Sequence, residues 1–117
     1  MVARVKAAYV PDRGDIIYLE FDPQKGREQK GKRPALVLSP KSYNGKVGLA
    51  IMCPITNQEK GYPFEVRLGE QLSVTGVILS DQVKSLDWRE RNASFSAKAP
   101  QRIMDEVRGK ILALLDT

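Results

Sequence analysis

The chain contains no histidine and only one cysteine, Cys53. Without imidazole, neither a Ser-His-Asp triad nor a Cys-His pair can form, and zinc sites that combine His with Cys are excluded. A single cysteine also rules out a disulfide within the chain. Any catalysis must therefore use Arg, Lys, Asp, Glu, Tyr, Thr or Ser, and Cys53, in an apolar segment, is expected to be a small buried hydrophobic residue.

Long apolar runs are lacking as well. No stretch approaches the roughly 20 residues that span a bilayer, and residues 1–10 lack the apolar core of a signal peptide. Neither a P-loop nor a GxGxxG motif is present, and the acidic residues are scattered singly. We therefore expect one cytoplasmic domain over residues 1–117, with no membrane contact, no cofactor and no bound metal.

Positive charge is concentrated in one short segment. The chain carries 19 Lys and Arg against 14 Asp and Glu, a net charge of +5. Residues 1–60 hold 11 basic and 6 acidic residues, whereas residues 61–117 hold 8 of each. Five cations and one acid fall between Lys25 and Arg33. Such a basic loop favours an anionic partner, with nucleic acid first, an acidic protein second and an anionic membrane third, although an ordinary solvated loop has the same composition.

Short β-strands are the dominant pattern. In residues 15–22 the apolar side chains Ile17, Leu19 and Phe21 alternate and so share one face. Residues 35–39 form a continuous apolar run, which is typical of a strand covered on both sides. Other strands are expected at residues 47–55, 64–68, 76–86 and 93–97.

Three short segments predict how these strands are interrupted. Asn44-Gly45 is typical of a hairpin turn that leads into the strand at 47–55. Pro54 indicates an edge position, a bulge or the end of that strand, because proline lacks the N–H donor. The stretch 76–86 is expected to be one long strand or two strands joined by a bend near Ser80-Asp81.

The C-terminal part changes from strand-like to helical spacing. Five apolar side chains recur at intervals typical of one helix face, namely Ile103, Val107, Ile111, Leu114 and Leu115. Pro100 suits the first turn of this helix. The sequence therefore predicts a mainly β fold, a small barrel of short strands, with a C-terminal amphipathic α-helix packed on it.

Seven strings follow one another in a distinctive order. They are Gly14-Asp15-Ile16-Ile17, Phe21-Asp22-Pro23, Gly26-Arg27-Glu28-Gln29-Lys30-Gly31-Lys32-Arg33-Pro34, Val37-Leu38-Ser39-Pro40, Pro54-Ile55-Thr56, Lys60-Gly61-Tyr62-Pro63-Phe64 and Asp81-Gln82-Val83-Lys84-Ser85. In order and spacing they resemble the MazF/PemK family of toxin endoribonucleases from toxin–antitoxin pairs. The resemblance extends from Gly14 to the last helix and is strongest to the MazF branch.

The resemblance implies an SH3-like small β-barrel that forms a homodimer. It also implies sequence-specific, metal-independent cleavage of single-stranded RNA, which leaves a 2′,3′-cyclic phosphate and a 5′-hydroxyl and inhibits translation and growth. A small acidic cognate antitoxin would cover the groove of the dimer, and the complex with the antitoxin would bind operator DNA.

By the same resemblance, Arg33 and Thr56 occupy the catalytic positions. A guanidinium presents a rigid fork of donors to phosphate oxygens that gain charge while a 2′-hydroxyl attacks, and the Thr56 hydroxyl adds a neutral donor. Single-stranded RNA suits this attack, because an A-form helix prevents the required alignment and DNA lacks the nucleophile. The group that accepts the hydroxyl proton stays open between Glu28, in the basic loop, and Asp81.

Other polar residues are expected to hold or read the RNA. Basic side chains in and beside the loop would bind phosphates, namely Lys25, Arg27, Lys30 and Lys32. Residues suited to contacting base edges are Gln29, Asn57, Gln58, Asp81 and Gln82. Tyr62 or Trp88 would stack on an unpaired base, although packing in the core or in a dimer interface suits both aromatic side chains as well.

Two other functions fit the same strings. One is a toxin of this fold that poisons DNA gyrase by protein contact and cuts no RNA. The other is a catalytically inactive relative that only binds RNA. The basic, glycine-containing loop with Arg33, together with Thr56, favours the enzyme.

Overall fold

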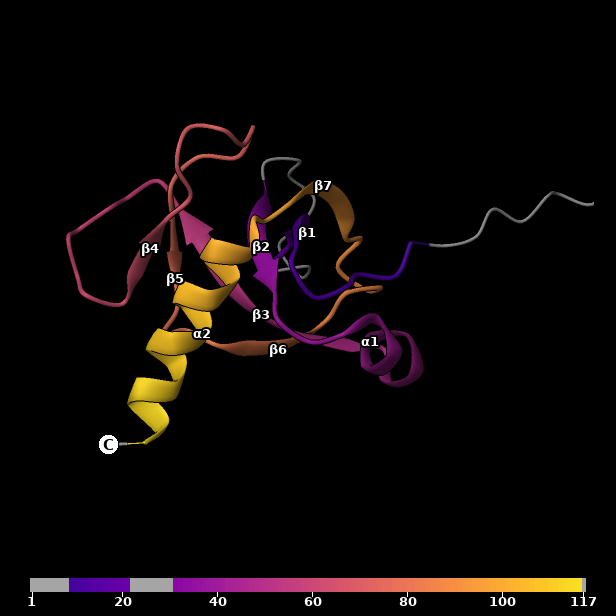
Figure 1. The fold of residues 1–117 in the computed structure, drawn as a ribbon. Coiled ribbons are helices and arrows are strands. Elements are labelled where there is room, and N and C mark those ends of the chain that lie inside the picture. Colours follow the sequence, from indigo (N-terminus) through magenta and orange to yellow (C-terminus); the bar gives the residue numbers. More distant parts are fainter. Residues whose placement is uncertain (1–8, 22–30, 117) are drawn as a thin grey trace, which may run out of the picture.

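The structure, a computed structural model, describes residues 9–21 and 31–116. In chain order the elements are β1 (Asp15–Glu20), β2 (Lys32–Val37), α1 (Lys41–Val47), β3 (Leu49–Thr56), β4 (Glu65–Arg67), β5 (Val77–Leu79), β6 (Lys84–Asp87), β7 (Ser94–Lys98) and α2 (Gln101–Leu115). The strands pair antiparallel in the order β4-β5-β3-β2-β1-β7, and β6 pairs with β3. Figure 1 shows α2 lying over the β4–β5 side of the sheet, while α1 lies on the opposite side of the molecule.

The expected mainly β class and the C-terminal helix are confirmed. The expected strand over residues 76–86 is two strands, β5 and β6, and the expected strand near residues 93–97 is β7. Within the part of the chain that the structure describes, the sheet does not close into a full barrel by pairing, because β4 and β7 lie at the two ends of the strand order. The arrangement is therefore an open, barrel-like antiparallel sheet.

Both faces of the central strands are buried. The first core cluster lies on the α2 side and contains Ile16, Leu36, Cys53, Ile55, Val66, Leu68, Val74, Ile78, Ala99, Ile103 and Val107. The second lies on the other face and contains Ile17, Leu19, Ala35, Val37, Ala50, Met52 and Trp88, with Phe21 packed against it. Ile17, Leu19 and Phe21 thus share a face as predicted, and the apolar run of β2 is covered on both sides as predicted.

Pro54 lies inside β3, at the point where this strand changes partners. The β2–β3 pairing ends at the pair Ala35↔Pro54, and β3 then pairs with β5 through Ile55 and Thr56. The expectation of a strand end or edge at Pro54 is therefore correct only for the ladder with β2. Because proline offers no N–H donor, the loss of the β2 ladder at this residue leaves no orphan amide.

The hairpin predicted at Asn44-Gly45 is wrong, because this segment is the helix α1. Asn44 is fully buried, and its Nδ2 donates to the carbonyls of Pro11 and Ser39 at 2.8 and 2.9 Å. Its Oδ1 accepts from the Ser39 hydroxyl at 2.6 Å, and its carbonyl accepts from the Trp88 indole at 3.1 Å. The helix ends at Gly48, which has a left-handed conformation with φ 84°. Tertiary contacts outweigh the local turn preference here.

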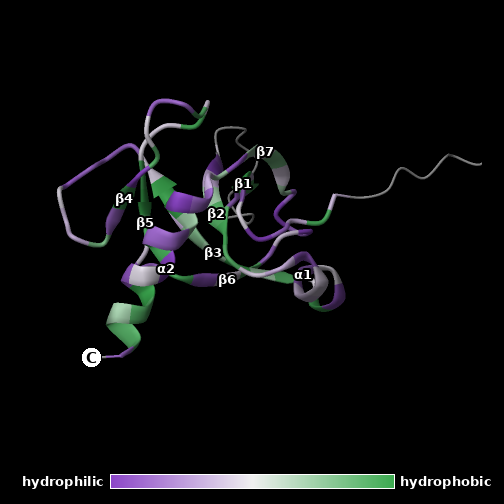
Figure 2. Cartoon of the chain, in the orientation of Figure 1, coloured by the Kyte–Doolittle hydropathy of each residue, from purple (hydrophilic) through white to green (hydrophobic). Residues whose placement is uncertain are grey.

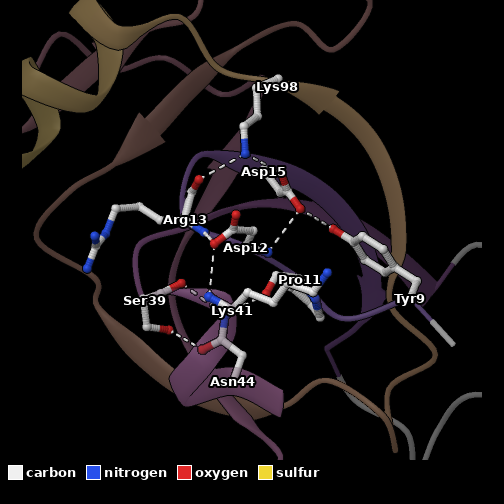
Figure 3. A network of polar contacts seen from close by, with 9 residues as sticks. All are labelled: Tyr9, Pro11, Asp12, Arg13, Asp15, Ser39, Lys41, Asn44 and Lys98. Atoms are coloured by element: carbon white, nitrogen blue, oxygen red, sulfur yellow. Dashed lines mark hydrogen bonds and ion pairs between the residues drawn. The ribbon is translucent and has the colours of Figure 1, made fainter. Parts of the chain in front are cut away.

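A polar network joins the segment before β1 to the end of β7 (Figure 3). The Tyr9 hydroxyl and the backbone N–H of Asp12 donate to Asp15 Oδ2 at 2.5 and 3.0 Å, and the Lys98 ammonium contacts Asp15 Oδ1 at 2.8 Å. Burial, together with the Asp15 carboxylate, raises the pKa of the Tyr9 phenol far above its ordinary value. The backbone N–H of Lys41 donates to Asp12 and lowers the pKa of the Asp12 carboxyl. The network fixes one end of the sheet.

The helix α2 buries its first half and exposes its last turns. Ile103 and Val107 are fully buried, and Ile111 packs against the first core cluster, as the helical spacing predicts. Leu112 and Leu115 are exposed, so the end of the helix remains apolar at the surface (Figure 2). Among the described helices, none is long and apolar enough to cross a membrane.

Candidate functional site

A cavity of about 350 Å³ lies where β2 begins and β3 ends. The strands contribute Arg33, Pro54, Ile55, Thr56, Glu65, Leu79 and Lys84, while the connecting segments contribute Phe21, Gln58, Lys60, Tyr62, Phe64, Asp81 and Gln82. Five of the residues predicted for the site therefore line one cavity, namely Arg33, Thr56, Gln58, Asp81 and Gln82.

Strand register explains why Arg33 and Thr56 meet. Opposite residues of β2 and β3 are Val37↔Met52 and Ala35↔Pro54. Side chains alternate with a period of two, so Arg33 lies on the same face as Ala35, and Thr56 on the same face as Pro54. Arg33 and Thr56 each lie two residues beyond the last β2–β3 pair, Ala35↔Pro54, at the edge of the second core cluster. The cavity is thus the outward continuation of a core face.

The Arg33 guanidinium is available to a ligand. The side chain is exposed, and no acidic side chain in residues 9–21 or 31–116 forms a hydrogen bond or ion pair with it. Its backbone belongs to the β1–β2 ladder as the partner of Leu19, and Pro34 follows it directly. A rigid strand therefore carries a fork of five N–H donors to the cavity.

The Thr56 hydroxyl is oriented by its own loop. Its Oγ1 accepts a hydrogen bond from the backbone N–H of Gln58 at 3.1 Å. A hydroxyl has one proton to donate besides its acceptor lone pairs. Because one lone pair is occupied by the Gln58 amide, the O–H of Thr56 remains able to donate to an anion in the cavity.

Charged side chains of both signs border the cavity. Lys60 and Lys84 add two cations to Arg33, and Glu65 and Asp81 are the two acids. The Glu65 carboxylate accepts hydrogen bonds from the backbone, whereas the exposed Asp81 carboxylate has no bonded partner within the described ranges. An elongated anion such as a phosphodiester chain suits this surplus of positive charge.

Two predicted contact residues within the described part of the chain do not line the cavity. The Lys32 ammonium donates to the carbonyl of Asn92 at 3.2 Å, on the other face of β2. The Asn57 Oδ1 accepts from the Thr75 hydroxyl at 2.9 Å. The other predicted loop residues lie outside the described residues, namely Lys25, Arg27, Glu28, Gln29 and Lys30.

The two aromatic candidates separate clearly. Trp88 is only 3% exposed and belongs to the second core cluster, so packing is its role and stacking on a base is not. Tyr62 is 60% exposed and lines the cavity, as a stacking residue must.

The sequence analysis missed five polar or aromatic residues that line the cavity, namely Phe21, Lys60, Phe64, Glu65 and Lys84. Four of them lie within the strings that carry the family resemblance, and Glu65 directly follows one of these strings. Their positions in those strings were the available signal, but strings alone do not tell which side of a loop faces a cavity.

The described part of the chain contains neither a cluster of metal ligands nor a reactive thiol. No group of three or more His, Cys, Asp and Glu side chains lies close enough there to hold a metal ion. Cys53 is fully buried as predicted, and burial, helped by the nearby Asp81 charge, raises the pKa of its thiol to about 12. The thiol therefore stays protonated and is a packing group rather than a nucleophile.

Comparison with known proteins identifies the family of the chain. The sequence profile of the family described as "PemK-like, MazF-like toxin of type II toxin-antitoxin system" matches residues 12–115. The endoribonuclease toxin MazF of Escherichia coli is 50% identical over 107 residues, which cover 92% of this chain and 96% of that protein.

Solved structures from Deinococcus radiodurans are similar over nearly their whole length. A crystal structure of MazE–MazF has a TM-score of 0.84 and 51% identity, with 92% of this chain and 97% of that chain covered. A crystal structure of MazF alone has a TM-score of 0.84 and 55% identity, with 94% and 100% covered. The chain therefore belongs to the PemK-like, MazF-like family of toxins of type II toxin–antitoxin systems.

Proposed function

We propose that this chain is a toxin endoribonuclease that cleaves single-stranded RNA at short sequences, without a metal ion, by attack of a 2′-hydroxyl on the adjacent phosphate. The products are a 2′,3′-cyclic phosphate and a 5′-hydroxyl. The observation that carries the proposal is one cavity lined by both Arg33, which pairs with no acidic side chain of the described residues, and Thr56, whose oxygen accepts from the Gln58 amide. The name of the Escherichia coli relative, an endoribonuclease toxin, supports it and gives no support to gyrase poisoning.

Arg33 and Thr56 stabilise the charge that develops during the attack. As the 2′-oxygen adds to phosphorus, negative charge builds on the two non-bridging oxygens. The guanidinium binds them as a fork, and the hydroxyl of Thr56 donates a further hydrogen bond. Both residues are fixed by strands, so the donors are in place before the charge appears and little reorganisation is needed.

The proton of the attacking hydroxyl requires a base. The Glu65 carboxylate is occupied by two backbone amides, whereas Asp81 lines the cavity with its carboxylate unbonded within the described ranges. Glu28, the other candidate, lies outside the described residues. We assign the role of base to one of these two carboxylates, which Asp81→Asn and Glu28→Gln distinguish through the acidic limb of the pH–rate profile.

The rest of the cavity would position the RNA. Lys60 and Lys84 are placed to bind phosphates beside the scissile bond, and the exposed Tyr62 ring is placed to stack on an unpaired base. Gln58 and Gln82 present amide groups that suit base edges, which provides sequence selectivity. Selectivity against DNA follows from the need for a 2′-hydroxyl.

The partners follow from the same proposal. A small acidic antitoxin would neutralise the toxin by covering the basic cavity, and the complex of the two would bind operator DNA. The MazE–MazF complex of the Deinococcus radiodurans relative supports an antitoxin partner. We place the protein in the cytoplasm, where single-stranded messenger RNA is available, and expect it to act as a homodimer.

Incubation of the purified protein with a long single-stranded RNA in EDTA tests the activity. We expect discrete cuts with cyclic phosphate ends, because no step requires a metal ion. Arg33→Ala should lower the cleavage rate by about 10²- to 10³-fold, the usual cost of a lost donor to the transition state. Thr56→Val, which keeps the shape of the side chain, should lower it by at least about tenfold.

The matched control is Arg102→Ala, which removes an exposed guanidinium from α2, outside the cavity. This variant should cut at the rate of the unchanged protein. Intact RNA under all conditions, combined with inhibition of DNA gyrase by the protein, would contradict the proposal.

A further inference from the structure

The loop between β3 and β4 forms one wall of the cavity. Four of its residues line the cavity, namely Gln58, Lys60, Tyr62 and Phe64. The Tyr62 ring and the Lys60 ammonium make no hydrogen bond, ion pair or ring contact with any residue in the described ranges. The positions of these two side chains therefore depend on the backbone of the loop. Contacts that hold this backbone also determine where Tyr62 and Lys60 lie relative to the RNA.

Glu65, the first residue of β4, binds this backbone directly. Its Oε2 accepts from the N–H of Lys60 at 3.0 Å, and its Oε1 accepts from the N–H of Gly61 at 2.9 Å. Gly61 has φ +83°, a conformation that turns two successive amides toward one carboxylate and that side chains rarely adopt. The N–H of Glu65 also donates to the carbonyl of Tyr62 at 3.1 Å, which closes the turn.

Two further contacts hold the end of the loop, and neither replaces Glu65. The N–H and the hydroxyl of Ser80 both donate to the carbonyl of Phe64, at 3.2 and 2.5 Å. The Lys110 ammonium of α2 donates to the carbonyl of Pro63 at 2.5 Å. These contacts fix residues 63 and 64, whereas residues 60 and 61 are held by the Glu65 carboxylate.

We propose that Glu65 is a positioning residue for RNA binding, whose carboxylate holds the loop over residues 60–62 so that Lys60 and Tyr62 face the nucleotides beside the scissile phosphate. This inference rests on the proposed function. Glu65 does not touch the reacting atoms, because both carboxylate oxygens point to backbone amides. Its loss should therefore weaken binding of RNA far more than it slows the chemical step at Arg33 and Thr56, which strands hold in place.

Two substitutions of Glu65 should weaken the contact with the loop to different degrees. Glu65→Gln keeps one carbonyl oxygen that can accept from a loop amide, and Glu65→Ala removes both acceptors. Glu59→Gln is the matched control, because Glu59 lies on the same loop, carries the same charge and pairs with Arg67 at 2.7 Å outside the cavity. All three variants should unfold at nearly the same urea concentration, since neither Glu65 nor Glu59 belongs to a core cluster.

The first measurement needs no RNA. Hydrogen exchange of the Lys60 and Gly61 amides should become about tenfold faster in Glu65→Ala, with Glu65→Gln between this variant and the unchanged protein, because a charge-assisted hydrogen bond is lost. Exchange of the Ile55 amide in β3 should not change. Unchanged exchange at Gly61 in Glu65→Ala would overturn the inference, whatever the protein does to RNA.

The second measurement uses a single-stranded oligonucleotide of the cleaved sequence and a copy with a 2′-deoxy sugar at the cut, which cannot react. Glu65→Ala should weaken binding of the unreactive copy at least about tenfold and raise KM similarly, while kcat at saturation changes less than about threefold. Glu59→Gln should bind as the unchanged protein does. Equal affinities for all variants would overturn the inference, whereas failure of the unchanged protein to cut or bind RNA would instead overturn the proposed function.

Discussion

Thr56 owes its position to a backbone contact that only glycine permits. A Cβ added at Gly76 would lie 2.3 Å from the carbonyl oxygen of Thr56 and 2.9 Å from its carbonyl carbon. Gly76 also has φ +116°, which other residues rarely adopt. The start of β5 therefore approaches the end of β3 closely, and the hydroxyl of Thr56 is presented from a firmly held strand.

Gly76→Ala should consequently damage both folding and cleavage. We expect a loss of about 1–3 kcal/mol in the free energy of unfolding, since the contacted atoms are backbone and cannot move aside cheaply. The rate of RNA cleavage should fall as Thr56 shifts. Urea denaturation and a single-turnover cleavage assay measure the two effects.

Gly109→Ala provides the opposite control. A Cβ at Gly109 meets nothing within 4 Å, and alanine is the better helix former by about 1 kcal/mol. This variant should be slightly more stable and fully active. Equal behaviour of the two glycine variants would contradict the role of close packing at Gly76.

At the residue scale, the sequence is a good guide to which side chains lie close together. It is a poorer guide to which side chains are exposed. Arg33 and Thr56 belong to strings with a defined strand register, so their meeting follows from alternation along β2 and β3. Trp88 and Tyr62 both suited stacking or packing by sequence, yet one is buried and the other exposed. Trp88 is buried because it packs in the second core cluster with residues distant in the sequence, and local sequence does not encode such contacts.

At the scale of elements, α1 is stabilised by one buried amide. Asn44 satisfies the carbonyls of Pro11 and Ser39 and so connects α1 to the segment before β1. Residues 41–47 include a glycine and offer no N-cap side chain, so the helix depends on this tertiary contact.

Asn44→Ala should lower the free energy of unfolding by about 2–4 kcal/mol, because two carbonyls lose their donor in a buried site. Cleavage measured well below the melting temperature should survive, since Asn44 does not line the cavity. Ser42→Ala, on the exposed side of the same helix, should be nearly neutral in chemical denaturation. A stability loss in Asn44→Ala no larger than in Ser42→Ala would refute this assignment.

The same element shows where sequence patterns reach their limit. The pattern of apolar and polar residues predicts the strands to within a few residues. This is because burial of one or both faces of a strand determines which of its residues are apolar. The turn predicted at Asn44-Gly45 is wrong because its local preference is weaker than the hydrogen bonds that join Asn44 to Pro11 and Trp88, which lie far from it in the sequence. Such contacts have no local signature.

At the scale of the whole molecule, the end of α2 presents exposed apolar side chains, among them Leu112 and Leu115. A hollow of about 360 Å³ lies between α2 and the segment before β1, lined by Arg13, Leu38, Gln101, Met104, Asp105, Arg108, Ile111 and Leu112. A second hollow next to it shares Leu38 and includes Tyr43 and Ile51. Arg13, Arg108 and Asp105 border the first hollow. We propose that this face, where apolar side chains lie among charges of both signs, packs against a second copy of the chain in the expected homodimer.

Leu112→Asp should therefore convert a dimer into a monomer. The substitution places a charge in the middle of the apolar face, where desolvation would cost several kcal/mol in a packed interface. Sedimentation velocity measures the change. Gln71→Asp adds the same charge on an exposed loop and should leave the dimer intact; a monomer in the unchanged protein would contradict the dimer proposal.

The sequence predicts little at this largest scale. Leu114 and Leu115 fit the helical spacing as well as Ile103 does, yet only the latter is buried within the chain. Periodicity reports that a side chain is apolar and on a given face, but not whether its own chain or a partner covers it. The open ends of the sheet at β4 and β7 escape prediction for the same reason.

The central strands have different surroundings at their two ends. The buried contacts of Asp15 and Asn44 stabilise the structure at one end of the strands, while the cavity and the β3–β4 loop lie at the other end. On the proposed function, we expect substitutions at positions 58, 60 and 62 to alter the recognised bases with little penalty to the scaffold, whereas Gly61 must be kept for its positive φ. Descendants of such a protein are free to diverge in their targets while keeping a common architecture, and a randomised library of this one loop is the natural starting point for reprogramming the cut site.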